Sequence, residues 1–390
     1  MQADVERPLL LPDTTPLIPM ADPAACMVEG LHAFVDRELA EVDRARRPSG
    51  SDAIDADDGR ALASRQRERL ARLLGVTDQR LPVPALELLT TTDGGAVVGK
   101  TAGYTAYAVR WPVLDGVDGE GLLLQPKGLP RAQVVVVPDA DWTPEQLAGL
   151  VAGVPPLAQF ARHLAERGCQ VVIPTLIDRQ DTWSGNPDIR MTNQPHREYV
   201  YRMAFELGRH IIGYEVQKVL ALVDYFHGPR RAGTPVGVYG YGEGGLLALY
   251  AAALDPRVAV TAVSGCFRNR RYVWQEPIYR DVWRLLRPTP DWPGFGDAQV
   301  AWLIAPRPLV VEAVPGPPVA GPPAGRDAPA PRRARYVLSP IPRCGRRWRW
   351  RARPTSDSGS VNDSFCSSRS RVRRNVLRSE RAVIWRGRIV

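Results

Sequence analysis

The sequence has no histidine after residue 227, and this absence excludes one arrangement of catalytic groups. The five histidines are His32, His163, His196, His210 and His227. A mechanism that takes its imidazole base from the C-terminal part of the chain is therefore excluded.

Cysteine is scarce and follows no metal-binding or disulfide pattern. The five cysteines are odd in number and widely spaced: Cys26, Cys169, Cys266, Cys344 and Cys366. Such spacing gives neither a disulfide framework nor a zinc motif. We expect no metal and no cofactor.

Long apolar runs are also missing. No stretch approaches the ~20 residues of a membrane-spanning helix. Asp4 and Glu6 lie where a secretory signal would carry positive charge, and Pro8, Pro12 and Pro16 interrupt the nearby leucines. We expect a cytoplasmic protein with no membrane partner.

The sequence does contain a glycine-rich stretch from Val236 to Ala253, which reads VGVYGYGEGGLLALYAAA. Its first residues are β-branched and aromatic, as in a buried parallel strand, and a small-residue helix is predicted from Leu246. Strand, glycine turn and helix form the context of the nucleophile elbow, G-x-S-x-G. In that motif, small residues two positions either side of the nucleophile let the strand and the helix approach closely.

Gly240 and Gly244 occupy those flanking positions, so Gly242 lies at the turn where a nucleophile belongs. A register shifted by one residue puts Glu243 at the turn, but Tyr241 then replaces a small flanking residue. In the first register Glu243 opens the helix, whose dipole favours a carboxylate by about 0.3–1 kcal/mol. A glycine-rich turn without chemistry is the alternative. A phosphate loop is not favoured, since neither G-x-G-x-x-G nor Gly-Lys-Ser/Thr occurs.

Strand-like and helical segments alternate around this stretch. Strands are predicted at 104–113, 122–125, 134–137, 170–173, 236–239, 258–263 and up to 312, and helices at 28–42, 58–74, 157–167 and 195–226, the last interrupted at Gly208 and Gly213. A capping threonine and a proline predict another helix start at Thr143. Helical crossovers between strands predict an α/β fold with a mostly parallel central sheet flanked by helices.

Polar residues follow several predicted strands. Asp139, Asp141 and Trp142 follow the strand at 134–137, and Asp178 opens a long polar loop after the next strand. Because ligand-binding loops lie at the carboxyl ends of parallel strands, we expect these residues to border a pocket, together with Gly244. The alternative is an acidic turn with a tryptophan at its rim.

From Gln133 to Ala313 the sequence resembles the dienelactone hydrolase and acetyl xylan esterase-like branch of the α/β-hydrolases. Three features carry the resemblance: the turn Gly240–Gly245, the helical motif Gly208–Gly213 and the strand entry Ile304–Leu309. The family elbow reads Gly-Tyr-Ser/Cys-x-Gly-Gly, and here it reads Gly-Tyr-Gly-Glu-Gly-Gly. The resemblance implies an α/β-hydrolase fold, ester hydrolysis and a small-molecule ester as the partner.

The same resemblance places Gly242 at the nucleophile position and Glu312 near the acid position, with no histidine after either. Because a serine-type mechanism needs a nucleophile and an oriented imidazole, we expect impaired or absent activity. Glu243 paired with Glu312, or with His196 or His210, could instead act as a carboxylate base on water. A histidine on a helix is more often structural than catalytic. A non-catalytic binding or scaffold protein on the same fold is the second interpretation.

Four regions are predicted: a poorly ordered lead-in at 1–26, a helical region at 27–100, an α/β-hydrolase-like domain at 101–313, and a Pro/Gly linker with an arginine-rich, disordered tail at 314–390. Residues 331–390 contain 17 arginines and three acids, a charge of +14, whereas the preceding residues sum to −5.

The arginine-rich tail has three interpretations. Arginines interleaved with tryptophans at 346–351 could bind nucleic acid through phosphates and stacked bases. A basic extension without a dedicated partner is the second interpretation. A lost reading frame is the third, since 3 lysines against 48 arginines indicate GC-rich coding and the tail lacks the family's final helix and histidine. Sequencing of the gene around codons 310 to 335 distinguishes the third from the others.

Overall fold

The computed structural model describes residues 22–45, 56–90, 95–180, 195–228, 233–267, 294–317 and 382–385. The chain divides into two compact units, Met1–Pro48 and Ser49–Val390. The aromatic-rich segment at 272–286, most of the polar loop after Asp178 and nearly all of the tail lie outside the described residues. The four regions predicted from the sequence stay predictions.

The first unit contains one described helix, α1 (Pro23–Ala45). Asp22 Oδ1 accepts the Ala24 N–H at 2.9 Å and so satisfies one of the free donors at the helix start. The apolar residues recur at helical spacing as the sequence predicts, and Leu39 and Val42 are buried.

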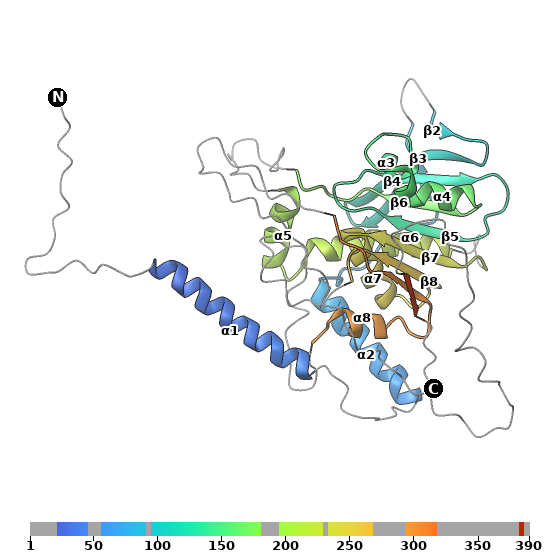
Figure 1. Ribbon diagram of the computed structural model, residues 1–390. Coiled ribbons are helices and arrows are strands. Elements are labelled where there is room, and N and C mark those ends of the chain that lie inside the picture. The colour runs from blue at the N-terminus through green and yellow to red at the C-terminus, as the bar shows by residue number, and fades with distance from the viewer. Residues whose placement is uncertain are drawn as a thin grey trace, which may run out of the picture. The chain divides into compact units, whose positions relative to one another are not determined.

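The second unit is built around one sheet (Figure 1). Its strands are β1 (Glu87–Leu88), β2 (Val97–Lys100), β3 (Tyr104–Leu114), β4 (Val117–Pro126), β5 (Gln133–Val137), β6 (Gln170–Pro174), β7 (Val236–Tyr241), β8 (Val260–Ser264), β9 (Leu309–Glu312) and β10 (Ala382–Trp385). They lie in the order β1-β3-β4-β6-β5-β7-β8-β9-β10, with β2 paired to β3.

The centre of the sheet is parallel, as predicted. Strands β6, β5, β7, β8 and β9 pair in parallel, whereas β3 and β4 form an antiparallel hairpin beside them. The chain passes from β5 to β6 on one side and then to β7 on the other side of β5. Strand order therefore reverses at β5, and in open α/β sheets the crevice at such a reversal is where ligands bind.

Helices cover both faces of the sheet because the central strands are apolar on both sides. Val135 and Val137 belong to one buried cluster, and Val134 and Val136 to the other. The helices of the second unit are α2 (Ala56–Leu74), α3 (Pro144–Ala148), α4 (Phe160–Glu166), α5 (His196–Glu206), α6 (Ile211–Phe226), α7 (Glu243–Leu254) and α8 (Asp297–Trp302), with a short 3-10 turn η1 (Pro156–Ala158). Residues of α3 and α4 pack on the second cluster, and residues of α2, α6, α7 and α8 on the first.

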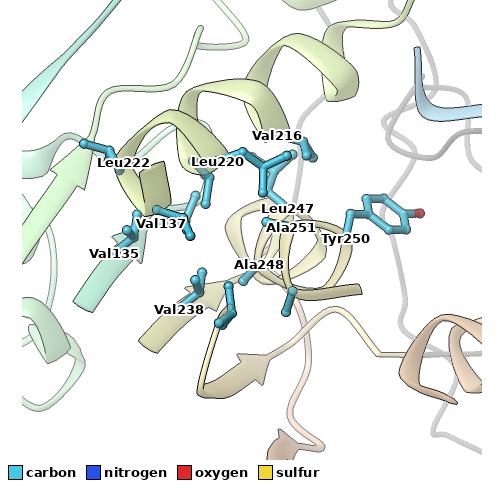
Figure 2. Packing of buried hydrophobic residues seen from close by; sticks show 14 of the residues in the cluster. Val135, Val137, Val216, Leu220, Leu222, Val238, Leu247, Ala248, Tyr250 and Ala251 are labelled. Carbon is cyan, nitrogen blue, oxygen red and sulfur yellow. The ribbon is translucent and has the colours of Figure 1, made fainter. Parts of the chain in front are cut away.

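Helix α7 is apolar around its whole circumference, which is typical of a helix buried on every side. Figure 2 shows Leu247 and Ala248 of this helix beside Val216 of α6 and Val238 of β7. Truncating a core leucine such as Leu247 to alanine typically costs about 2–5 kcal/mol. This packing fixes the start of α7 against the carboxyl end of β7.

The predicted long helix at 195–226 is two helices, α5 and α6, separated at Gly208–His210. Gly208 has φ +70° and ends the first helix, as predicted. The prediction of a second interruption at Gly213 was wrong. That glycine lies inside α6, where a Cβ would be 2.3 Å from the Leu74 carbonyl oxygen, so it serves close helix packing.

The helix start predicted at Thr143 is present in full. Thr143 Oγ1 accepts the Gln146 N–H at 3.3 Å, and Gln146 Oε1 accepts the Thr143 N–H at 3.0 Å. This reciprocal capping fixes the loop between β5 and α3, which contains Asp139, Asp141 and Trp142.

Candidate active site

The turn between β7 and α7 is the position that the resemblance assigns to the nucleophile elbow. Gly242 lies at this turn with φ +58° and ψ −123°, and α7 begins at the next residue. The register with Glu243 at the turn is not the one observed. The backbone at Gly242 is thus in a left-handed conformation that favours glycine, while Glu243 enters the first turn of the helix.

The two flanking glycines are required by close backbone contact. A Cβ on Gly240 would lie 2.0 Å from the Gly244 carbonyl oxygen, and a Cβ on Gly244 would lie 2.1 Å from the Pro138 carbonyl oxygen. No side chain fits at either position, as the elbow pattern predicts. The corner is therefore built as in an elbow, but its apex carries no side chain.

Asp139 lies directly against this apex. Its Oδ1 accepts the backbone N–H of Glu243 at 2.8 Å, and a Cβ added to Gly242 would lie 2.5 Å from the same oxygen. In hydrolases of this fold, the N–H of the residue after the nucleophile helps to bind the oxyanion. Here that donor is already bonded to a carboxylate, and Asp139 is buried.

Two arginines hold the Glu243 carboxylate. Arg179 Nη2 donates to Glu243 Oε2 at 2.6 Å, and Arg197 Nη2 donates to Glu243 Oε1. Arg179 Nη1 also donates at 2.8 Å each to Asp139 Oδ2 and Asp141 Oδ2. Both oxygens of this carboxylate are therefore occupied by guanidinium donors.

The ion pairs continue into α6. Arg197 Nη1 donates to Glu215 Oε1 at 3.2 Å, and Glu215 also accepts the Ile177 N–H at 3.0 Å and pairs with Lys218. The charges alternate from α6 across the ends of β6, β7 and β5, so that every buried acid faces a base.

Burial disfavours the charged form of Arg179, but the nearby carboxylates of Glu243 and Asp139 outweigh it. The pKa of Arg179 is therefore raised above its ordinary value, and the guanidinium stays charged.

The two candidate histidines lie elsewhere. His196 Nδ1 is 2.9 Å from Asp178 Oδ1, and His210 Nδ1 accepts the Ile212 N–H at 3.0 Å as the cap of α6. The ring of His210 also makes an edge contact with Tyr201 at 4.9 Å between centroids. Among the described residues no histidine hydrogen-bonds to Glu243 or Glu312.

Glu312, at the acid position, pairs with a serine on the neighbouring strand. Ser264 Oγ donates to Glu312 Oε2 at 2.6 Å. Tyr239 is next to this pair: burial and the Glu312 charge raise the pKa of Tyr239 to about 12, although a hydrogen bond with Ser264 opposes them. Among the described residues Glu312 therefore bonds a serine, and no hydrogen bond joins it to Glu243.

The remaining predicted pocket residues surround the corner. The Trp142 ring stacks on Tyr241, with centroids 4.8 Å apart and planes inclined by 19°. Asp141 Oδ1 accepts the Arg179 N–H at 3.2 Å, and half of the Asp141 side chain is exposed. Two shallow cavities lined by described residues lie elsewhere, around Thr234 and beside Met203.

Sequence reasoning missed Arg179, Arg197, Glu215 and Ser264 as site residues. A signal was available for Glu215, a lone acid beside the apolar face of a predicted helix, because a buried acid demands a buried base. Nothing in the sequence indicated which arginine would supply it. In the described part of the chain no cluster of three or more histidine, cysteine or acidic side chains could hold a metal ion. No described helix is both long and apolar enough to cross a membrane.

A sequence model of the dienelactone hydrolase family matches residues 120–266. This span includes Asp139, both arginines and the glycine turn, and it ends just after Ser264. A search of curated proteins found no matching sequence.

Several solved esterases are similar in structure. A putative acetyl xylan esterase from Bacteroides fragilis has 16% identity, covers 72% of this chain and 73% of its own, and gives a TM-score of 0.48. Acetyl xylan esterase 1 from Thermoanaerobacterium sp. has 17% identity, covers 67% of this chain and 75% of its own, and gives a TM-score of 0.37. A glucuronoyl esterase from Solibacter usitatus has 14% identity, covers 68% of this chain and 76% of its own, and gives a TM-score of 0.42. Likeness at this level carries no information about substrate or reaction.

The family match confirms the resemblance that the sequence indicates, and the described sheet is mostly parallel and flanked by helices as that resemblance implies. The chain is an α/β-hydrolase-fold protein whose residues 120–266 match the dienelactone hydrolase family.

Proposed function

We propose that this chain is a pseudoenzyme: a relative of carboxylic ester hydrolases that keeps the fold and the elbow but does not hydrolyse esters by the serine-type mechanism. The observation that carries the proposal is Gly242 at the apex, with the Asp139 carboxylate 2.5 Å from where its Cβ would be. No atom at that position is able to attack a carbonyl carbon.

Two further contacts support the proposal. The Glu243 N–H that would stabilise an oxyanion is bonded to Asp139 at 2.8 Å. Glu312, at the acid position, accepts a hydrogen bond from Ser264 rather than from an imidazole. The nucleophile is thus replaced by Gly242, and the oxyanion donor and the acid both have other hydrogen-bond partners.

The proposal is tested by assaying the full chain on simple aryl and acetyl esters beside the Glu243→Gln variant purified in the same way. The expected result is no saturable turnover in either preparation. Turnover by the unaltered chain that disappears in a Glu243→Gln preparation shown by circular dichroism to be folded would instead support a carboxylate base acting on water. Turnover that is equal and saturable in both would also contradict the pseudoenzyme.

The family match favours a small ester-like molecule as the ligand. We propose that the site binds such a ligand and does not catalyse a reaction on it. The nucleic-acid role of the arginine-rich tail lies outside the described residues and stays a prediction. A salt-dependent shift of DNA that is lost on deleting residues 331–390 is its test.

A further inference from the structure

We propose that the backbone N–H of Glu243 and the guanidinium of Arg179 form a carboxylate-binding site, and that the side chain of Asp139 is its internal ligand. The inference rests on the proposed function, because both assign a tethered carboxylate to the place where an oxyanion would bind. Its test measures binding of a free carboxylate and does not depend on hydrolysis.

The geometry is that of a bound carboxylate held through both oxygens. Asp139 Oδ2 accepts from Arg179 Nη1 at 2.8 Å. Asp139 Oδ1 accepts from Arg179 Nη2 at 3.4 Å and from the Glu243 N–H at 2.8 Å. A fork of two guanidinium donors is the arrangement that proteins use to bind carboxylates, and the third donor belongs to the first turn of a 12-residue helix.

The Arg179 guanidinium is buried and still has an unused donor. The Arg179 side chain is only 6% exposed, yet its Nε has no hydrogen-bond acceptor among the described residues. A buried donor left without a partner costs stability, so Arg179 has donor capacity that the described carboxylates do not fill.

The Asp139 carboxylate fits at this position because Gly242, at the apex, has no side chain. A Cβ on Gly242 would be 2.5 Å from Asp139 Oδ1, which is closer than a contact distance. Asp139 can therefore occupy the oxyanion position only because residue 242 has no side chain.

The expected affinity for a free carboxylate is modest. Without Asp139, the described ion pairs join three bases (Arg179, Arg197 and Lys218) and three acids (Asp141, Glu215 and Glu243). These described charges balance, so acetate gains the three hydrogen bonds but no excess of positive charge from them. For a ligand of this size we expect a Kd of about 1–10 mM.

The test is rescue of the full-length Asp139→Gly variant by acetate, which replaces the atoms that the substitution removes. With 100 mM sodium acetate in place of sodium chloride at equal ionic strength, the Tm of the variant is expected to rise by about 5 °C, saturably. The unaltered chain is expected not to respond, because its site is filled. Asp139→Asn should not respond either, because its amide oxygen still accepts the Glu243 N–H.

Two control variants separate this site from general ion effects. Asp141→Ala also removes a carboxylate from Arg179, but from its exposed side, and should show no acetate response. Adding Arg179→Met to Asp139→Gly should abolish the response. If Asp139→Gly does not fold, Asp139→Ala with sodium formate is the second test, because Cβ then stays and formate replaces the missing carboxylate. Failure of acetate to exceed chloride in Asp139→Gly and of formate to exceed chloride in Asp139→Ala, or an equal response in Asp141→Ala, overturns the proposal. Hydrolysis by the unaltered chain would contradict the pseudoenzyme and leave this result unchanged.

Discussion

Glu243 is the one charged residue of α7, whose other residues are glycine, leucine, alanine and tyrosine. Burying a lone carboxylate in such a helix would cost several kcal/mol. Its ion pairs with Arg179 and Arg197 offset that cost, and they fix both arginines relative to the corner. Glu243 is therefore a positioning residue of the described site, whatever ligand the site takes.

Replacing Glu243 with glutamine should destabilise the second unit strongly. The variant leaves two buried guanidinium groups without their shared charge, and breaking a buried pair in this way costs about 3–5 kcal/mol. The matched control is Glu120→Gln, whose pair with Arg110 is 2.6 Å long but half exposed, and which should cost no more than about 1 kcal/mol. Urea unfolding of both variants measures the difference. Equal losses in the free energy of unfolding would show that the buried pairs of Glu243 contribute no more stability than the exposed pair of Glu120.

Asp255, the residue after α7, should make stability depend on acid pH. Burial raises the pKa of Asp255, but hydrogen bonds from the Arg257 side chain and backbone lower it further, so the net shift is downward. A depressed carboxyl pKa adds stability above the unfolded value of about 3.9, and this stability is lost as pH falls through the folded value.

The prediction is that Asp255→Asn is less stable than the unaltered chain at pH 7, and that the difference shrinks below about pH 4. Urea titrations from pH 3 to pH 7 measure it. Asp115→Asn, at the exposed hairpin turn, serves as the control for the same substitution at an exposed position. A difference for Asp255→Asn that is constant with pH would contradict the assignment.

At the scale of the element, the half-buried side chain of Arg307 donates several hydrogen bonds at the carboxyl end of α7, where Arg67 also donates to the Ala253 carbonyl oxygen at 3.1 Å. Arg307 donates to the carbonyl oxygens of Ala252 at 2.8 Å and of Asp255 and Val258 at 2.9 Å. Burial and the nearby Arg67 charge lower the pKa of Arg307 to about 10, while Asp255 opposes them, so the side chain stays charged at neutral pH. A cation here also complements the negative end of the helix dipole.

Arg307→Met keeps the length and apolar character of the side chain but leaves those carbonyls without their donor. We expect a loss of about 3 kcal/mol in the free energy of unfolding, since hydrogen bonds to a charged group contribute about 1.5–3 kcal/mol each and water replaces some of them. Arg162→Met, at an exposed pair with Glu166 within α4, should leave the free energy of unfolding nearly unchanged. Similar losses in both would mean that Arg307 does not cap α7.

Two helix-interior glycines give a matched test of packing against propensity. Alanine is favoured over glycine in a helix by about 1 kcal/mol. Gly30 in α1 has no atom within 4 Å of an added Cβ, so Gly30→Ala should increase helicity. Gly213 in α6 has the Leu74 carbonyl oxygen at 2.3 Å, so Gly213→Ala should lose about 1–3 kcal/mol. Circular dichroism and urea unfolding distinguish the signs, and a stabilising Gly213→Ala would contradict the close approach of α2 and α6.

The same glycine shows where sequence reasoning succeeds and where it stops. Apolar runs such as 134–137 and the capping residues at Thr143 predict their elements well, because the signal is local. From the sequence alone Gly213 resembles a helix breaker. Its real role is to let α6 approach the Leu74 carbonyl, and the local sequence does not show this because Leu74 is distant along the chain. Arg179 and Arg197 were missed for the same reason: their shared partner Glu243 is 64 and 46 residues away. Gly242 at the turn was predictable, since the pattern lies within six residues.

At the scale of the whole molecule, the described sheet ends at a strand contributed by the last residues of the chain. β10 pairs antiparallel with β9, from Ala382 opposite Glu312 to Trp385 opposite Leu309. On its other side β9 pairs in parallel with β8, so β10 satisfies the backbone groups of the outer edge of β9. An unpaired strand edge is a template for association with another chain.

Ending the chain after residue 381 should therefore promote self-association, because it removes β10 and leaves the edge of β9 unpaired. A chain that ends after residue 385 retains β10 and is the matched control, since it loses only Arg386–Val390. Sedimentation velocity over a hundredfold range of concentration measures the association. The shorter chain is expected to form dimers or larger species as concentration rises, while the control sediments like the full chain. Identical behaviour of the two truncations would mean that the four residues of β10 do not protect this edge, because the strand is the difference between them.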